Sequence, residues 1–432
     1  MLVAFAMANY ACFRDRQELS MEAAVRSPKD DTYAFHTGVR RFPRLNRVSA
    51  IYGPNGSGKS RFVQGLDFAQ SFVVGSSRES QAGEKIRHVP FLFDAETVRR
   101  PTTFETCFVQ DETAYEYGFA VDRSRVHEEW LLAWPPGGRM RRLLQRTFDP
   151  ETGEEGWFFG ASVRGPKELW RTSTRPNSLF VSTAAQLNSD TFRPVIDWFT
   201  NLRVLGAGDL DPSYTVKSIR EQADFKDRVL TILKDADIAV TDVRTRTEQR
   251  RLEELDPPPP PMLTDGLADT SVIVFFDVDF EHSPAQTGGR YVVNIDDESD
   301  GTQRLFAFAG PWLDILDNKR VVVIDELDRS LHPLLVASLI RRINSAGTPE
   351  DEKRAQRVAT MHDVSLLRDV LDRSQIWFTD KDRRSEAATL TPLSDFSPRP
   401  REALVRGYLG GRYGGVPIIG ESELDGPTAV PD

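Results

Sequence analysis

A stretch able to bind phosphate stands near the N-terminus. Residues 51–60 read IYGPNGSGKS, which contains G-x-x-x-x-G-K-S between an apolar run and the helix-like RFVQGLDFAQ. In such a loop the glycines let backbone N–H groups surround phosphates, and the following helix N-terminus adds positive potential. Lys59 is placed to reach the β- and γ-phosphates and Ser60 to ligate Mg²⁺. We predict that ATP and Mg²⁺ bind Gly53, Pro54, Asn55, Gly56, Ser57, Gly58, Lys59, Ser60 and Arg61.

Two adjacent carboxylates supply the second part of this chemistry. The run RVVVIDE, residues 320–326, predicts a strand buried on both faces that ends in Asp325 and Glu326. Parallel sheets place ligands at the C-terminal ends of their strands. We therefore predict that Asp325 holds the Mg²⁺ shell and that Glu326 orients or deprotonates the attacking water. Asp328 is a candidate contact to a second subunit.

A further segment precedes the carboxylate strand. Residues 298–304 read ESDGTQR and open an apolar helix pattern, LFAFAG. Ser299, Gly301 and Thr302 at a helix start favour an anion site made of backbone N–H groups. In ABC-type ATPases this position is the signature, which meets the γ-phosphate of ATP held by the other subunit. We therefore expect hydrolysis when two copies of the chain come together.

A histidine completes the set. Residues 358–363, VATMHD, predict a short strand that ends in His362, one strand beyond the strand of the carboxylates. His362 is expected to bind the γ-phosphate and position the water. The predicted catalytic residues are thus Lys59, Glu326 and His362. His332 is expected to cap or pack against a helix start.

The elements that carry these motifs are far apart in the chain. Lys59 and Asp325 are separated by 266 residues, which indicates a core split by a long insertion. We expect a first strand near the N-terminus, an antiparallel hairpin at 104–121, a helical insert around 178–233 and strands at 271–280 and 291–295. The fold class is α/β, a P-loop NTPase of ABC-ATPase type, with a mixed core sheet, an antiparallel β lobe and a helical lid.

The expected division follows from those elements. Residues 1–125 form the first half of the core with the antiparallel lobe, and residues 126–262 the insertion. The five prolines at 257–261 end that insertion as a stiff linker. Residues 263–420 form the second half of the core, and residues 421–432 are a tail.

Composition narrows the classes of function. The net charge is −10, which argues against a dedicated nucleic-acid binder, although contact with DNA or RNA stays open. No stretch is apolar over the ~18 residues of a membrane span. Only Cys12 and Cys107 are present, which predicts a reducing, cytoplasmic setting without a structural zinc site.

The motifs together resemble a known group, the stand-alone bacterial ABC-like AAA-family ATPases related to the abortive-infection ATPase RloA. The similar segments include LNRVSAIYGPNGSGKS, ESDGTQRLFAFAGP, VVVIDELDRSLHP, TMHD and, near the C-terminus, QIWFTDKD and YLGGRYGGVP. Heads of chromosome-maintenance (SMC) and OLD-family ATPases are similar. The resemblance implies a cytosolic, ATP-dependent dimer or higher oligomer in anti-phage defence, encoded beside an effector that is commonly a nuclease. Asp300 replaces the first glycine of the usual signature. No Q-loop glutamine can be placed, and we expect the neighbourhood of Pro90 and Phe91 to do that job differently.

Other functions fit parts of the sequence. A transport ATPase would be compact, which the long insertion argues against. A nuclease fused to the ATPase is suggested by Asp380 and Asp382, but a hairpin turn between QIWFT and ATLTPL explains the acidic pair better. A nucleic-acid repair or maintenance ATPase, and a nucleotide switch with little turnover, remain alternatives to a regulator of an effector.

Overall fold

The computed structural model describes residues 1–24, 32–79, 81–206, 212–251, 272–284, 286, 288–318, 320–329, 331–345, 355–367, 370–397 and 403–416. The proline run at 257–261 and the tail at 421–432 lie outside these residues. Within them, no helix is long and apolar enough to cross a membrane.

A six-stranded sheet forms the centre of the molecule. Its order is β11 (Arg203–Leu205), β15 (Val321–Ile324), β16 (Gln356–Met361), β5 (Val48–Tyr52), β17 (Ile376–Lys381) and β18 (Ala388–Pro392). All neighbours are parallel except β17 and β18, which form the predicted antiparallel hairpin. The P-loop strand β5 is thus separated from the carboxylate strand β15 by the histidine strand β16. This order confirms the α/β fold class with a mixed core sheet.

The apolar runs of these strands are explained by burial on both sides. Ile51, Val323 and Val358 face one hydrophobic core, whereas Ala50, Val322 and Ala359 face the other. Alternate side chains of a strand point to opposite faces, so both sets must be apolar.

The first core lies against a seven-stranded antiparallel sheet. Its order is β10 (Glu155–Phe159), β9 (Arg141–Phe148), β8 (Val126–Trp134), β7 (Thr113–Val121), β6 (Thr102–Gln110), β1 (Leu2–Ala8) and β2 (Gln17–Ser20). The predicted first strand and the predicted hairpin are therefore confirmed as β1 and as β6–β7. The boundary expected at residue 125 falls inside this sheet, between β7 and β8. The same core includes side chains of α1 (Lys59–Gly75), α3 (Phe180–Gln186) and α4 (Arg193–Asn201).

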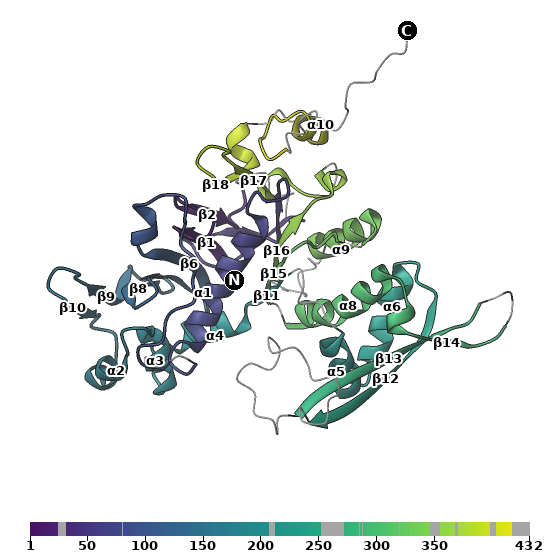
Figure 1. Ribbon diagram of the computed structural model, residues 1–432, viewed down its shortest axis with the longest axis horizontal. Coiled ribbons are helices and arrows are strands. Elements are labelled where there is room, and N and C mark those ends of the chain that lie inside the picture. The colour runs from purple at the N-terminus through teal and green to yellow at the C-terminus, as the bar shows by residue number, and fades with distance from the viewer. Residues whose placement is uncertain are drawn as a thin grey trace, which may run out of the picture.

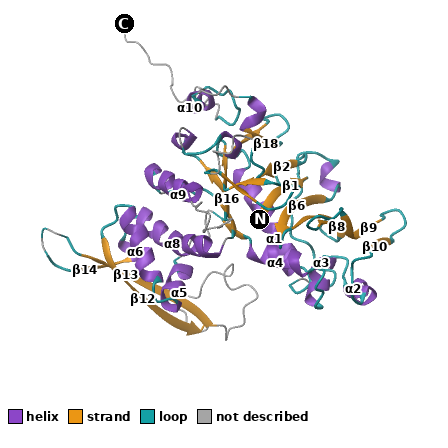
Figure 2. Cartoon of the chain, turned by 180° about the vertical axis from the view of Figure 1, so that it is seen from behind, coloured by secondary structure: helices purple, strands orange, loops and turns teal. Residues whose placement is uncertain are grey.

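The second core lies beneath helices and a separate small sheet. Helices α5 (Ser213–Glu221), α6 (Phe225–Asp235), α8 (Asp300–Asn318) and α9 (Pro333–Ser345) contribute to it. The small sheet has the order β12 (Val240–Arg251), β13 (Val272–His282) and β14 (Tyr291–Asn294). Figure 1 and Figure 2 show this lobe and the strands β8–β10 on opposite sides of the central sheet.

The predicted helical insert is interrupted by a strand. Helices α3 to α6 occupy it as expected, but Arg203–Leu205 forms β11 and pairs in parallel with β15. A run of three residues is too short to show the alternation of apolar and polar side chains that indicates a strand. The sequence analysis therefore assigned this edge strand to the surrounding helical pattern. Short elements complete the fold: α2 (Lys167–Ser173), α10 (Leu404–Leu409), β3 (Ala34–His36) and β4 (Arg44–Asn46).

Helix α8 contains a proline that another helix accommodates. Pro311 lies inside α8 and cannot donate the helical hydrogen bond to Ala307. The hydroxyl of Thr215 on α5 donates instead to the oxygens of Phe306 and Ala307, at 2.9 and 3.2 Å, and accepts from the N–H of Gly310 at 3.0 Å. Helix α5 therefore holds α8 at its proline.

Candidate nucleotide-binding site

The P-loop connects β5 to α1 and is shaped by two close approaches. A Cβ on Gly53 would lie 2.2 Å from Thr379 Oγ1, and a Cβ on Gly58 would lie 2.9 Å from Cys12 Sγ. Gly58 also has φ +109°, a left-handed conformation that glycine adopts without strain. Ser57 Oγ and Thr379 Oγ1 lie 2.6 Å apart and share a hydrogen bond. Thr379 of strand β17 therefore contacts the P-loop at both Gly53 and Ser57 and helps to fix its shape.

The start of α1 is suited to an anion. Gly58 caps the helix without a side-chain hydrogen bond, and the first turn contains no acidic residue. The first N–H groups of a helix have no intrahelical partners, so they can donate to phosphate oxygens. Lys59 is buried, and its Nζ donates to the oxygens of Gly53 at 2.7 Å and Pro54 at 3.1 Å. Burial lowers the pKa of Lys59, although the nearby carboxylates of Asp325, Asp328 and Glu326 oppose that shift.

The two carboxylates at the end of β15 are positioned by β16. Asp325 is buried, and its Oδ1 accepts a hydrogen bond of 2.6 Å from Thr360 Oγ1. The same hydroxyl accepts from the N–H of Glu326 at 2.7 Å. Glu326 has φ +52°, which is unusual for a residue other than glycine; such conformations cluster at active sites and ligand-binding segments.

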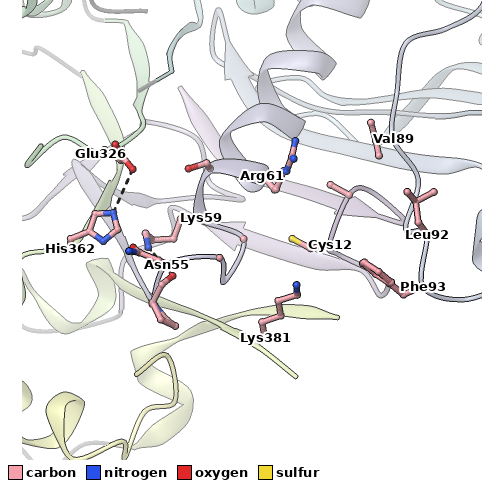
Figure 3. Close-up of a pocket in the computed structure, with 15 residues that line it drawn as sticks. Cys12, Asn55, Lys59, Arg61, Val89, Leu92, Phe93, Glu326, His362 and Lys381 are labelled. Carbon is pink, nitrogen blue, oxygen red and sulfur yellow. Dashed lines mark hydrogen bonds and ion pairs between the residues drawn. The ribbon is translucent and has the colours of Figure 1, made fainter. Parts of the chain in front are cut away.

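Glu326 and His362 face each other, as Figure 3 shows. Glu326 Oε1 lies 3.8 Å from His362 Nε2, and Glu326 Oε2 lies 3.2 Å from Arg329 Nη1. Asp328 Oδ2 accepts from the N–H groups of His362 at 2.7 Å and Asp363 at 2.5 Å. Asp328 therefore orders the histidine loop of its own chain, a role that the sequence did not indicate. His332 Nδ1 accepts from the N–H of Leu334 at 3.3 Å, which agrees with the predicted capping of α9.

One cavity of about 550 Å³ joins most of the predicted site residues. Pro54, Asn55, Gly56, Gly58, Lys59, Ser60, Arg61, Glu326 and His362 line it. Gly53, Ser57 and Asp325 do not line this cavity. Ser57 and Asp325 are buried. The cavity also contains residues that the sequence analysis missed: Ala11, Cys12, Val89, Leu92, Phe93 and Lys381.

The predicted signature residues lie elsewhere. Ser299, Gly301 and Thr302 do not line this cavity. Ser299 Oγ accepts from the N–H of Thr302 at 3.2 Å and lies 2.9 Å from Thr302 Oγ1. Ser299 is exposed while Thr302 is buried, so Ser299 caps an α8 N-terminus that faces outward.

The residues present fit Mg²⁺. In the described parts of the chain, no three His, Cys, Asp or Glu side chains are grouped so that they could hold a metal alone. Mg²⁺ typically uses one or two carboxylates together with substrate phosphates. The buried carboxylate of Asp325 and the hydroxyl of Ser60 match that donor set.

Asp382, one of the acidic pair at the β17–β18 hairpin, accepts hydrogen bonds within the turn. Asp382 Oδ1 accepts from the N–H groups of Arg384 at 3.1 Å and Ser385 at 2.7 Å. These hydrogen bonds stabilise the turn of the predicted hairpin between β17 and β18.

The comparison with protein-family models decides the family. Residues 48–368, more than half of the chain, match the family described as "AAA domain, putative AbiEii toxin, Type IV TA system". The chain belongs to this AAA-domain family. The matched range of this AAA-domain protein contains the P-loop, the signature segment, the carboxylate pair and His362. No curated protein sequence matches the chain.

Solved structures similar to this AAA-domain protein include SMC heads and the recombination mediator protein RecF. The SMC head domain from Thermotoga maritima is 14% identical, with a TM-score of 0.38, and the match covers 90% of this chain and 98% of that chain. The SMC head bound to the C-winged helix domain of ScpA is 12% identical, with a TM-score of 0.42 and coverages of 90% and 96%. The recombination mediator protein RecF-ATPrS of the RecFOR pathway is 12% identical, with a TM-score of 0.34 and coverages of 90% and 98%.

Proposed function

We propose that this protein binds ATP with Mg²⁺ and hydrolyses the terminal phosphoanhydride bond. The observation that carries the proposal is the convergence of Lys59, Glu326 and His362, from the ends of three adjacent strands, on one cavity. The P-loop backbone and Lys59 bind the phosphates. Ser60 and Asp325 hold the metal, which when bound neutralises charge on the phosphate oxygens.

The hydrolytic step is assigned to the residues at the end of β15 and β16. Glu326 accepts a proton from the attacking water, or orients it, because its carboxylate lines the cavity that the P-loop opens into. His362 lies beside that carboxylate and donates toward the γ-phosphate. Asp328 and Thr360 position these two residues without lining the cavity.

We propose a shared site in a dimer or higher oligomer. Ser299, Gly301 and Thr302 lie outside their own chain's cavity, at the start of α8, where Ser299 is exposed, Gly301 half-buried and Thr302 buried. In the proposed dimer this helix start binds the γ-phosphate held by the partner. Hydrolysis then separates the two chains.

The biological setting is inferred from the resemblance to the RloA-related group. We propose a cytoplasmic ATPase of anti-phage defence that regulates or scaffolds a separately encoded effector, a nuclease by that resemblance alone. A role in nucleic-acid repair or maintenance, with DNA or RNA contact, is the second candidate, and a nucleotide switch with little turnover is the third.

Binding is tested by calorimetry with Lys59→Ala. We expect loss of ATP binding, because the variant removes the cation nearest to the phosphates. Lys217→Ala, which changes an exposed lysine on α5, is the matched control and should bind normally. Unchanged affinity in Lys59→Ala would refute the P-loop assignment.

The shared site is tested with Glu326→Gln. The substitution removes the base but keeps the phosphate contacts, so we expect an ATP-bound dimer that persists in light scattering. A monomer at saturating ATP would contradict the shared-site mechanism while leaving ATP binding intact.

A further inference from the structure

Three large apolar side chains are exposed at the end of the cavity away from Glu326. Val89 is 47% exposed, Leu92 60% and Phe93 66%. All three line the cavity, and Figure 3 shows them gathered on the far side of Cys12 from Lys59 and His362. Neighbouring apolar side chains left in contact with water mark a binding surface more often than isolated ones do.

The segment that carries them is held in place by the end of β1. Asn9 Oδ1 accepts from the N–H of Phe91 at 3.1 Å, and Asn9 Nδ2 donates to the oxygens of Thr97 at 2.7 Å and Arg100 at 2.8 Å. The N–H of Ala11 donates to the oxygen of Val89 at 2.7 Å. This apolar segment is therefore ordered by hydrogen bonds and is not a loop that exposes apolar groups by chance.

Phe93 has a defined support. Phe91 is buried at 1% exposure, and its ring packs edge-on against Phe93 with centroids 5.7 Å apart. Lys381 Nζ lies 6.0 Å from the centroid of the Phe93 ring and forms an ion pair with Glu386. Phe93 thus has an aromatic neighbour and a cation over its ring, and it is still 66% exposed, which leaves ring area for stacking.

We propose that Phe93, with Leu92 and Val89, binds the purine base of the nucleotide whose phosphates lie on the P-loop. This inference rests on the proposed function and adds the base-binding part of the same site. The P-loop end of the cavity is polar and cationic, whereas this end is apolar, so an elongated ligand with an anionic end and a flat apolar end matches both. A cavity of about 550 Å³ is in the range for such a ligand.

The residues at the apolar end favour recognition by stacking. Replacing a stacking aromatic ring by alanine typically lowers the affinity for the base several-fold to about a hundredfold. A purine offers more stacked area than a pyrimidine, so Phe93 should favour ATP over CTP.

The experiment compares ATP, CTP and inorganic tripolyphosphate, each with Mg²⁺, by calorimetry on the full chain. The wild-type protein should bind ATP more tightly than tripolyphosphate. Phe93→Ala should lower the affinity for ATP about tenfold and leave the affinity for tripolyphosphate unchanged. It should also reduce the difference in affinity between ATP and CTP. Phe93→Tyr should keep the wild-type pattern. Phe158→Ala removes a ring that is 40% exposed on β10, outside the cavity, and is the matched control.

The outcomes separate this inference from the proposed function. If the wild-type protein binds neither ATP nor tripolyphosphate, the proposed function fails. If the wild-type protein binds ATP and tripolyphosphate equally tightly, only the base-binding role is overturned. The same holds if Phe93→Ala leaves the affinity for ATP unchanged, or lowers the affinities for ATP and tripolyphosphate to the same extent. Because Phe93 is exposed, the alanine variant should retain the wild-type melting temperature.

Discussion

Arg304 of α8 donates from Nη2 to the backbone oxygen of Glu326 over 3.0 Å. The helix that begins with the signature segment is thus bonded to the peptide that carries the proposed catalytic carboxylate. Glu326 has φ +52°, a conformation that persists only where neighbouring groups hold it. Burial, with the charge of Arg329 adding to it, lowers the pKa of Arg304.

Replacing Arg304 should impair turnover more than binding. Arg304→Gln shortens the donor, so Glu326 loses a hydrogen bond from a charged group, which is typically worth ~1.5 to 3 kcal/mol. We expect kcat for ATP to fall at least about tenfold, with little change in ATP affinity, because Arg304 does not line the cavity. Steady-state hydrolysis and calorimetry measure the two effects.

The control for Arg304 is Arg171→Gln, which changes an exposed arginine on α2 that pairs with Glu168. Its kcat should equal that of the wild-type protein. A wild-type kcat in Arg304→Gln would show that the contact is not needed to position Glu326.

Thr360 should contribute both to the stability of the fold and to the binding of Mg²⁺ by Asp325. Thr360→Val keeps the shape of the side chain but removes its hydrogen bonds to Asp325 and to the N–H of Glu326. Leaving buried polar groups without partners typically costs about 1 to 3 kcal/mol each. We expect a lower free energy of unfolding in urea and a higher Mg²⁺ concentration for half-maximal hydrolysis. Thr360→Ser keeps the hydroxyl and should retain the wild-type Mg²⁺ dependence; equal effects of the two variants would count against this role.

Gly53 should tolerate no side chain. The Cβ of Gly53→Ala would lie 2.2 Å from Thr379 Oγ1 and 2.6 Å from the Thr379 oxygen, so the P-loop must shift. We expect a loss of stability of about 1 to 3 kcal/mol together with lost ATP binding. Gly56→Ala meets no atom within 4 Å and has φ +79°, so its loss of stability should be backbone strain of only about 1 kcal/mol. Chemical denaturation compares the two, and a larger loss in Gly56→Ala would contradict the steric explanation.

ATP affinity should fall at alkaline pH because of Lys59. Burial lowers the pKa of this lysine below its ordinary value of 10.5. As pH rises through the lowered pKa, Lys59 loses its proton and its attraction for the phosphates, so the dissociation constant should increase before an ordinary lysine would titrate. Calorimetry from about pH 7 to about pH 10 measures this effect. Lys59→Arg remains charged over that range, and if it binds ATP its affinity should vary less with pH. An affinity of the wild-type protein that stays constant across the range would contradict the prediction.

The same lowered pKa has a consequence for folding. Since the unfolded chain retains the Lys59 proton at pH values where the folded chain has released it, the unfolded state binds more protons between the two pKa values. The contribution of Lys59 to the free energy of unfolding therefore rises with pH in that window.

The main motifs of the candidate site were recognisable in the sequence alone. The P-loop, the Asp325–Glu326 pair and the strand before His362 are local patterns, in which a few adjacent residues encode both a strand and the turn that ends it. The hairpins β6–β7 and β17–β18 were also predictable, because alternating side chains and turn residues lie next to each other in the chain. The short strand β11 was not predictable, because the strand that it pairs with in the sheet, β15, lies more than a hundred residues away.

Only the tertiary structure decided which residues support those motifs. Thr379 beneath the P-loop, Thr360 beside Asp325 and Arg304 behind Glu326 have no spacing relative to their partners that a sequence pattern could detect. The proposed role of Phe93 was hidden for the same reason, because Asn9, which directly follows β1, holds the loop of Phe93 at the cavity only in the folded chain. Motifs that depend on hydrogen bonds between neighbouring residues can be found in the sequence, whereas contacts between distant segments exist only once the chain has folded.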